Sequence, residues 1–149
     1  MCDYCDCRSH TAIATLSADH ERLLADLTRL RVAAEANNAE EGRAIAKRLH
    51  GRLHDHADRE ERGVFEQLAL AGVGDDYLGR FTDEHERVHD LLRVVVTTAW
   101  QPAALELARV LTEHIAREET DLFPAAHQQL APQQWDAVDA VHATNEENR

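Results

Sequence analysis

The stretch HADREERGVF, at residues 56–65, returns in altered form as HIAREETDLF at residues 114–123. The two stretches share His, Arg, two Glu and Phe at matching positions, and Val in the first aligns with Leu in the second. A shorter pair precedes them, DHER at 19–22 and EHER at 84–87. This repeated order indicates two related halves of the chain, each a pair of helices, placed about a pseudo-twofold axis.

Apolar residues recur every three to four positions in four segments, which is the period of an amphipathic helix that faces a core. We expect helices over residues 17–36, 38–71, 81–100 and 102–124, with Ser17 as the cap of the first and Pro124 at the end of the fourth. Pro132 opens a short fifth helix. The sequence therefore predicts an all-α fold, an up-down-up-down four-helix bundle with a short C-terminal helix. The predicted divisions are a cysteine-containing tail at 1–16, the bundle at 17–125, and a C-terminal helix and tail at 126–149.

The composition excludes several classes of protein. The chain of 149 residues has a formal net charge of −12, which argues against nucleic acid or an anionic membrane as a partner. Its longest apolar run, around residues 91–100, is too short to cross a membrane, and its polar start lacks the apolar segment of a signal peptide. We therefore expect a soluble, cytoplasmic, single-domain protein, and the 10 histidines direct attention to a metal site.

Histidine and glutamate fall on the helix faces that should be apolar. Each of the four inward faces carries histidine, and two also carry a glutamate four residues after a histidine, one turn further on. These residues are His20, His56, Glu60, His85, His89, His114 and Glu118. One inward histidine is usually a hydrogen-bonded core residue, but burying an uncompensated carboxylate is costly. Because no Lys or Arg lies on these faces, the pattern favours a pair of metal ions in the core of the bundle.

The two halves are not equivalent at one position. Each half supplies two histidines and one glutamate, so the predicted site is dinuclear and each glutamate can bridge. His89 follows His85 by four residues, whereas the matching position in the first half is Leu24. One metal then receives three histidines and the other two, which leaves the second metal with an open coordination position for a ligand.

The order of these residues resembles the hemerythrin-like (HHE cation-binding) family over residues 17–125. The resemblance implies a four-helix bundle with a non-haem centre of two iron ions and an oxo or hydroxo bridge. It implies that one iron is bound by His85, His89 and His114, and the second by His20 and His56, with Glu60 and Glu118 bridging. Dioxygen, or another small diatomic or peroxide ligand, would then be the partner of the second iron. Oxygen carriers of the family place Asp five positions after the last histidine, where this chain has Glu119; we expect Glu118 to bridge and Glu119 to face away, as Glu61 does.

Three functions are compatible with this ligand set. The first is a di-iron protein that binds or senses dioxygen. The second is an enzyme of oxidative or nitrosative defence, with peroxidase- or catalase-like activity or nitric oxide handling, although no inward Lys or Tyr marks a proton donor. The third is iron donation or storage. Ligand spacing does not separate them, because the residues around the ligands decide among such functions.

The remaining histidines and the cysteines have less specific patterns. Cys2, Cys5 and Cys7, with His10 nearby, are compatible with a metal site, a redox pair or a thiol-rich tail. We expect a side-face position for His50 and His54 and a surface position for His127 and His142. The charged run at 58–62 is expected to be solvated except for Glu60.

Overall fold

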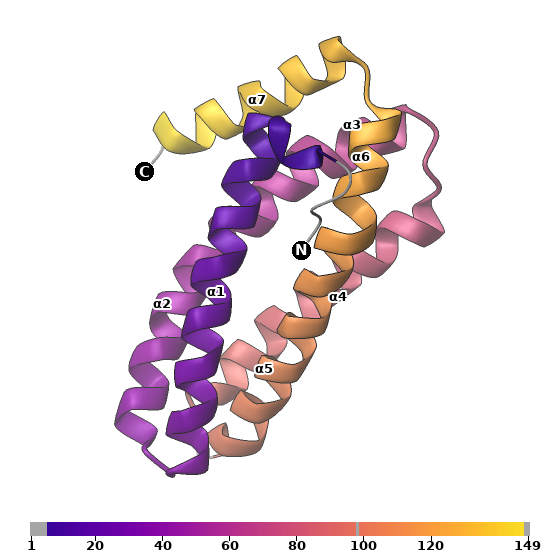
Figure 1. Ribbon diagram of the computed structural model, residues 1–149. Helices are drawn as coiled ribbons and strands as arrows, with labels where there is room; N and C mark the ends of the chain where they lie inside the picture. Colours follow the sequence, from indigo (N-terminus) through magenta and orange to yellow (C-terminus); the bar gives the residue numbers. More distant parts are fainter. Residues whose placement is uncertain (1–5, 98, 148–149) are drawn as a thin grey trace.

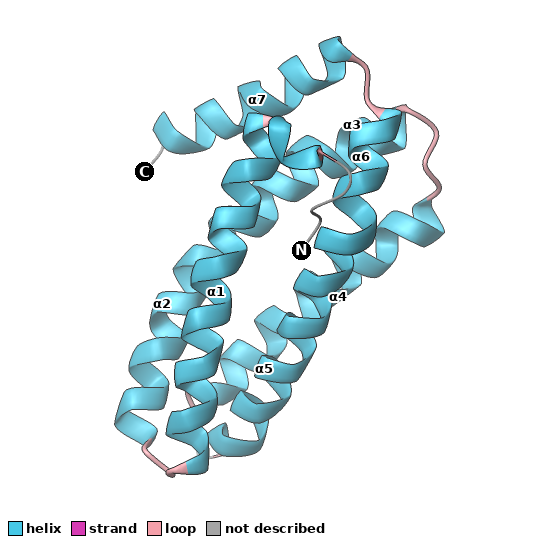
Figure 2. Cartoon of the chain, in the orientation of Figure 1, coloured by secondary structure: helices cyan, strands magenta, loops and turns pink. Residues whose placement is uncertain are grey.

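The structure, a computed structural model, describes residues 6–97 and 99–147, and these contain helices and no strand. The long helices are α1 (Thr11–Glu35), α2 (Ala39–Arg59), α4 (Asp75–Val95) and α5 (Trp100–Arg117) (Figure 1). Each packs on two neighbours: α1 on α2 and α5, and α4 on α2 and α5. The predicted all-α four-helix bundle is confirmed, and short loops join the helices (Figure 2).

Two of the long helices continue through a wider turn. α2 runs through the π-helical turn η2 (Glu60–Phe65) into α3 (Glu66–Leu70), and α5 runs through η3 (Glu118–Leu122) into α6 (Phe123–Gln129). Both π turns begin at the glutamate that was predicted to bridge two metals. Such turns are rare and occur frequently at functional sites, because they re-aim side chains without ending the helix.

Four predicted helix boundaries were wrong. The third helix ends at Val95 and not at residue 100. The first helix begins at Thr11 and not at Ser17, because the apolar residues Ile13 and Leu16 continue its buried face. The third begins at Asp75, where two aspartates in the first turn interact favourably with the helix dipole. Pro124 does not end the fourth helix; it lies in the first turn of α6, directly after the π turn, where a missing N–H is tolerated.

A polar layer divides the core of the bundle in two. One apolar cluster includes Leu23, Leu53, Val88 and Leu111, and the other includes Leu16, Val64, Phe81 and Leu122. On each long helix the inward histidines and glutamates lie between a residue of the first cluster and a residue of the second. The polar residues are therefore at the same depth on all four helices.

The remaining elements lie at one end of the bundle. η1 (Cys7–Ser9) precedes α1, and α7 (Pro132–Glu147) crosses α1, α2 and η2 (Figure 1). α7 lies against Gly63, where a Cβ would be in ordinary van der Waals contact with Cγ1 of Val138, at 3.5 Å. His142, on α7, is buried, so its predicted surface position was wrong. Among the described residues, no helix has the length and apolar character that a membrane crossing needs.

Candidate metal centre

Six of the seven predicted ligands meet in the polar layer. They form two overlapping sets, His20 and His56 with both glutamates, and His85 and His114 with both glutamates. In each set the ligand atoms lie within 4.8 Å of one another, and all six side chains are buried. Glu60 and Glu118 belong to both sets, which is the arrangement expected of two carboxylates that bridge two cations.

The histidine nitrogens are spaced like ligands of a common ion. Nε2 of His20 lies 3.0 Å from Nε2 of His56, and Nε2 of His85 lies 3.1 Å from Nε2 of His114. Two nitrogens that each bind one cation at ~2.1 Å are separated by about 3 Å. Glu118 reaches both pairs, with Oε2 at 3.4 Å from His20 Nε2 and Oε1 at 3.7 Å from His85 Nε2. Each glutamate also contacts the histidine four residues before it, Glu60 with His56 and Glu118 with His114.

The four carboxylate oxygens of Glu60 and Glu118 are buried and have no hydrogen-bond partner among the described residues. A buried polar atom without a partner is costly, and a buried charge is more so. Burial and the charge of Glu118 raise the pKa of Glu60. The pKa of Glu118 is instead held well below 4.5, because its interactions with His114, Glu60 and His20 outweigh the effect of burial. Two cations between them would remove both penalties, and the residues present therefore fit a metal pair.

A carboxylate accepts a hydrogen bond from Nδ1 of each of the four histidines. The four pairs are His20–Glu119 at 2.8 Å, His56–Asp19 at 3.2 Å, His85–Glu61 at 3.0 Å and His114–Glu84 at 2.6 Å. With a proton fixed on Nδ1, Nε2 is left as the ligand atom and points at the centre. The sequence suggested that Glu119 and Glu61 face away from the centre. This expectation was wrong, because each of them orients a histidine.

The four carboxylates that accept from the histidine Nδ1 atoms, here called the outer carboxylates, occupy matching positions in the two halves of the internal repeat. Asp19 and Glu84 directly precede His20 and His85, and each binds a histidine of the neighbouring helix. Glu61 and Glu119 directly follow the bridging glutamates, and each binds a histidine of the other adjacent helix, His85 on α4 and His20 on α1. The shared DHER/EHER and REE patterns contained this signal, because a residue repeated beside a ligand can have a repeated role.

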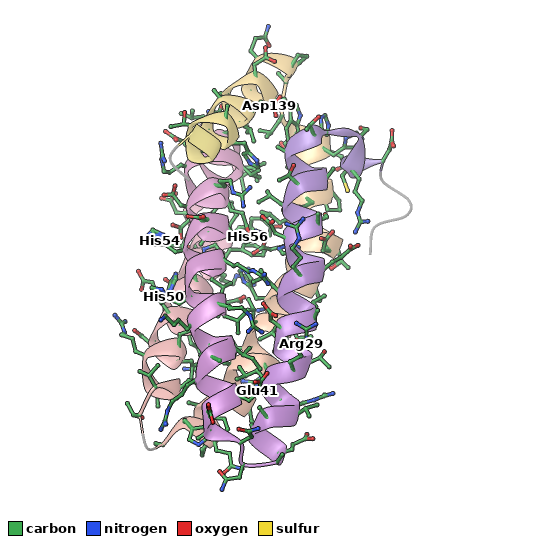
Figure 3. All side chains as sticks on the ribbon, turned by 90° about the vertical axis from the view of Figure 1, so that its left-hand side faces the viewer. Arg29, Glu41, His50, His54, His56 and Asp139 are labelled. Atoms are coloured by element: carbon green, nitrogen blue, oxygen red, sulfur yellow. The ribbon has the colours of Figure 1, made fainter. Side chains whose placement is uncertain are left out.

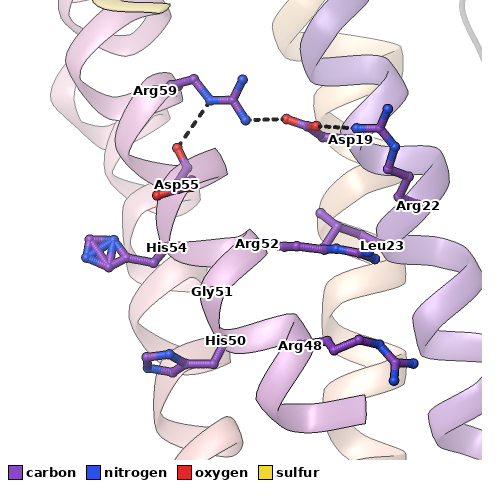
Figure 4. Close-up of a pocket in the computed structure, with 10 residues that line it drawn as sticks. All are labelled: Asp19, Arg22, Leu23, Arg48, His50, Gly51, Arg52, His54, Asp55 and Arg59. Carbon is purple, nitrogen blue, oxygen red and sulfur yellow. Dashed lines mark hydrogen bonds and ion pairs between the residues drawn. The ribbon is translucent and has the colours of Figure 1, made fainter. Parts of the chain in front are cut away.

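Arginines pair with three of the four outer carboxylates. Arg8 lies 3.7 Å from Glu119, and two arginines at matching positions of the repeat pair with Asp19 and Glu84. Arg59 is buried and donates to Asp19 at 2.6 Å, whereas the matching Arg117 is half exposed and contacts Glu84. The expectation that the run at 58–62 is solvated apart from Glu60 was therefore wrong for Arg59. Figure 4 shows Asp19 between Arg59 and Arg22, along a groove of about 740 Å³ between α1 and α2.

His89 is not in either set of converging ligands. It is half-buried on α4, and its ring lies edge-on to that of His50, with 6.2 Å between the ring centres. It also borders a cavity of about 10 Å³ next to the four ligand histidines. Apolar side chains complete the wall of this cavity: Leu23, Leu53, Val88, Leu111 and Ile115. The assignment of His89 to one of the metals stays a prediction.

The cysteine-rich segment is described only in part. Cys2 and Cys5 lie outside the described residues, and Cys7 is buried in the apolar cluster beside η1 and α6. Burial raises the pKa of the Cys7 thiol. His127, expected at the surface, is partly buried, with Nδ1 at 3.0 Å from Nε2 of His10. A metal or redox role of the cysteines stays a prediction.

Comparison with known proteins gives one match. Residues 11–126 match the model of the Hemerythrin HHE cation binding domain. Neither the curated proteins nor the solved structures give a significant match to the chain. The match begins at the first residue of α1 and ends within α6, so it spans the whole bundle and both halves of the ligand cluster.

Proposed function

Because the chain belongs to the Hemerythrin HHE cation binding domain family, we propose that it is a non-haem di-iron protein that binds or senses dioxygen. The two irons would be held by His20 and His56, and by His85 and His114, with Glu60 and Glu118 shared between them. Imidazole and carboxylate ligands suit iron, and two carboxylates can bridge an ion pair. An oxo or hydroxo bridge would complete the centre.

The observation that carries this proposal is the set of four buried carboxylate oxygens without hydrogen-bond partners among the described residues. They lie between two pairs of histidine Nε2 atoms, and the outer carboxylates occupy every Nδ1. A structural hydrogen-bond network would have used these oxygens as acceptors. A metal pair accounts for both glutamates and all four histidines at once.

The cavity beside the cluster favours a small ligand. A volume of about 10 Å³ has room for roughly one water-sized molecule. Its walls are mostly aliphatic, and among the described residues none that lines it is Lys or Tyr. Redox-active iron, when bound, supplies electrons and a coordination position, and the protein supplies an apolar space that excludes larger substrates. Peroxide turnover has less support, because among the described residues no Lys, Tyr or carboxylate lines this space, and His89 is its one imidazole outside the ligand sets.

Metal analysis with optical spectroscopy tests the proposal. Purified protein is loaded with Fe²⁺ under anaerobic conditions, its iron content is measured, and it is then mixed with air-saturated buffer. Two irons per chain and new charge-transfer bands on mixing are expected. One iron or none per chain, or no optical change with dioxygen, would refute it. Peroxide decay measured against free iron, and iron retention against a chelator, separate the defence and iron-donor functions.

A further inference from the structure

Three histidines outside the metal cluster lie close together at the surface between α2 and α4. His50 and His54 are exposed and one turn apart on α2. Figure 4 shows both side chains on the same side of α2, opposite to Arg48 and Arg52, and Figure 3 shows them on the outer side of the bundle. α4 packs against α2 and places His89 beside them, with its ring centre 6.2 Å from that of His50.

We propose that His50, His54 and His89 form a second metal site, which takes one divalent transition-metal ion from solvent and passes it to the buried centre. Two histidines four residues apart on a helix present their rings to one ion. Two imidazoles bound at ~2.1 Å to the same ion have ring centres roughly 4.5–5.5 Å apart. The His20–His56 pair has this spacing, at 4.7 Å, and the His50 and His89 rings need to approach by about 1 Å to reach it. His54 is exposed, so rotation of its side chain brings it to the same ion at little cost.

The surroundings suit an all-imidazole site. Asp58, one turn after His54, pairs with Arg62 at 3.1 Å, and Glu61 accepts from Nδ1 of His85. Three neutral imidazoles with water in the remaining positions suit Co²⁺, Ni²⁺, Zn²⁺ or Fe²⁺.

The position of His89 connects this site with the buried one. The cavity that His89 borders is also lined by His20, His56, His85 and His114. An ion released from the surface histidines thus enters the space next to the ligands of the buried centre. Binding at the surface site does not depend on the proposed function, whereas delivery rests on metal binding by the buried cluster.

Cobalt titration of the full-length protein tests the surface site. The protein is first loaded with iron and oxidised, and Co²⁺ binding is then followed by calorimetry and by visible absorption. One additional Co²⁺ per chain is expected, with the double variant His50→Ala/His54→Ala binding it at least 10-fold more weakly. The control Glu66→Gln, at an exposed position on α3, should bind Co²⁺ like the wild type. Unchanged Co²⁺ affinity in the double variant overturns the proposal, whether or not the buried cluster takes up iron.

The rate at which the buried centre takes up Fe²⁺ tests whether the surface site delivers metal to it. At limiting Fe²⁺, the metal-free double variant should fill its buried centre several-fold more slowly than the wild type, with the same final iron content and spectrum. Equal rates overturn delivery and leave the surface site standing. His89→Ala should weaken Co²⁺ binding to the iron-loaded protein. If instead His89→Ala changes the spectrum of the iron centre while the double variant does not, His89 is a ligand of the buried centre and the three-histidine site is wrong.

Discussion

Replacing Glu60 by Gln should stabilise the metal-free protein and destabilise the metal-loaded one. In the metal-free protein both oxygens of Glu60 are buried without a hydrogen-bond partner among the described residues, next to the equally buried Glu118. Glu60 contacts His56, but its oxygens make no hydrogen bond among the described residues, and removing the buried charge beside Glu118 should add about 2 kcal/mol to the free energy of unfolding. For a chain of this size that corresponds to a rise of about 4–8 °C in Tm.

The stability that Glu60→Gln gains over the wild type should increase with pH. The pKa of Glu60 is raised from its usual 4.5, first by burial and then by the charge of Glu118. The folded wild type therefore holds its proton more tightly than the unfolded chain, and it loses stability as the pH rises above 4.5 towards the folded-state pKa. Gln does not titrate, so the advantage of Glu60→Gln over the wild type should be larger at pH 8 than at pH 5.

Bound metal should make the wild type more stable than the Glu60→Gln variant. Free Fe²⁺ at 1,000 times its Kd adds about 4 kcal/mol to the wild type, which leaves it about 2 kcal/mol above a variant that no longer binds the pair. The assay is thermal unfolding by circular dichroism, with chelator and then with anaerobic Fe²⁺. Glu86→Gln, at an exposed position on α4, is the matched control and should change neither curve. A variant that is less stable than the wild type in chelator would show that Glu60 has a structural hydrogen-bonding role, and our reasoning would be wrong.

Three further changes have distinct expected outcomes. Asp19→Ala leaves Nδ1 of His56 without its acceptor and should lower iron affinity about 10–100-fold in chelator competition, with little change in helix content; unchanged affinity would contradict the orienting role. Burial lowers the pKa of His142 from 6.5 to about 4, so only the unfolded chain takes up this proton between those values. Stability should therefore fall by about 3 kcal/mol as the pH drops from 6.5 to 4, and His142→Leu should lose less; parallel Tm profiles of variant and wild type would exclude this. Gly42→Ala, a change that usually favours a helix, should here cost about 1–3 kcal/mol and alter Trp fluorescence, because the new Cβ collides with the Trp100 ring; a stabilised variant would show that the ring moves freely.

The sequence predicted the bundle and most of the metal cluster because both depend on helical periodicity. A histidine and a glutamate four residues apart share a face in any helix, so Glu60 and Glu118 could be placed inward without knowing the helix packing. His89 also lies four residues after an inward histidine, yet its ring contacts His50 at the edge of the bundle. Where a residue lies near the boundary of an inward face, the packing of the neighbouring helix decides its direction.

The partners of the histidine Nδ1 atoms were missed for another reason. Helical spacing places Glu119 about 100° from Glu118, which suggested an outward direction. The π turn at Glu118 widens the helix at this point, and Glu119 binds both His20 and Ser17. Likewise, nothing in the local pattern around His142 predicts burial, because its burial follows from α7 crossing the end of the bundle.

The polar layer between the two apolar clusters also has a consequence for cooperativity. Each cluster is a separate set of buried contacts, and without cations the layer between them consists of buried carboxylates and imidazoles in place of apolar packing. The metal-free protein is then made of two units that can open with different free energies, which native-state hydrogen exchange resolves as two classes of amide. Cations held by all four helices tie these units together, so that unfolding becomes a single transition. Metal occupancy would in this way set not only how stable the bundle is but also whether it unfolds as one body.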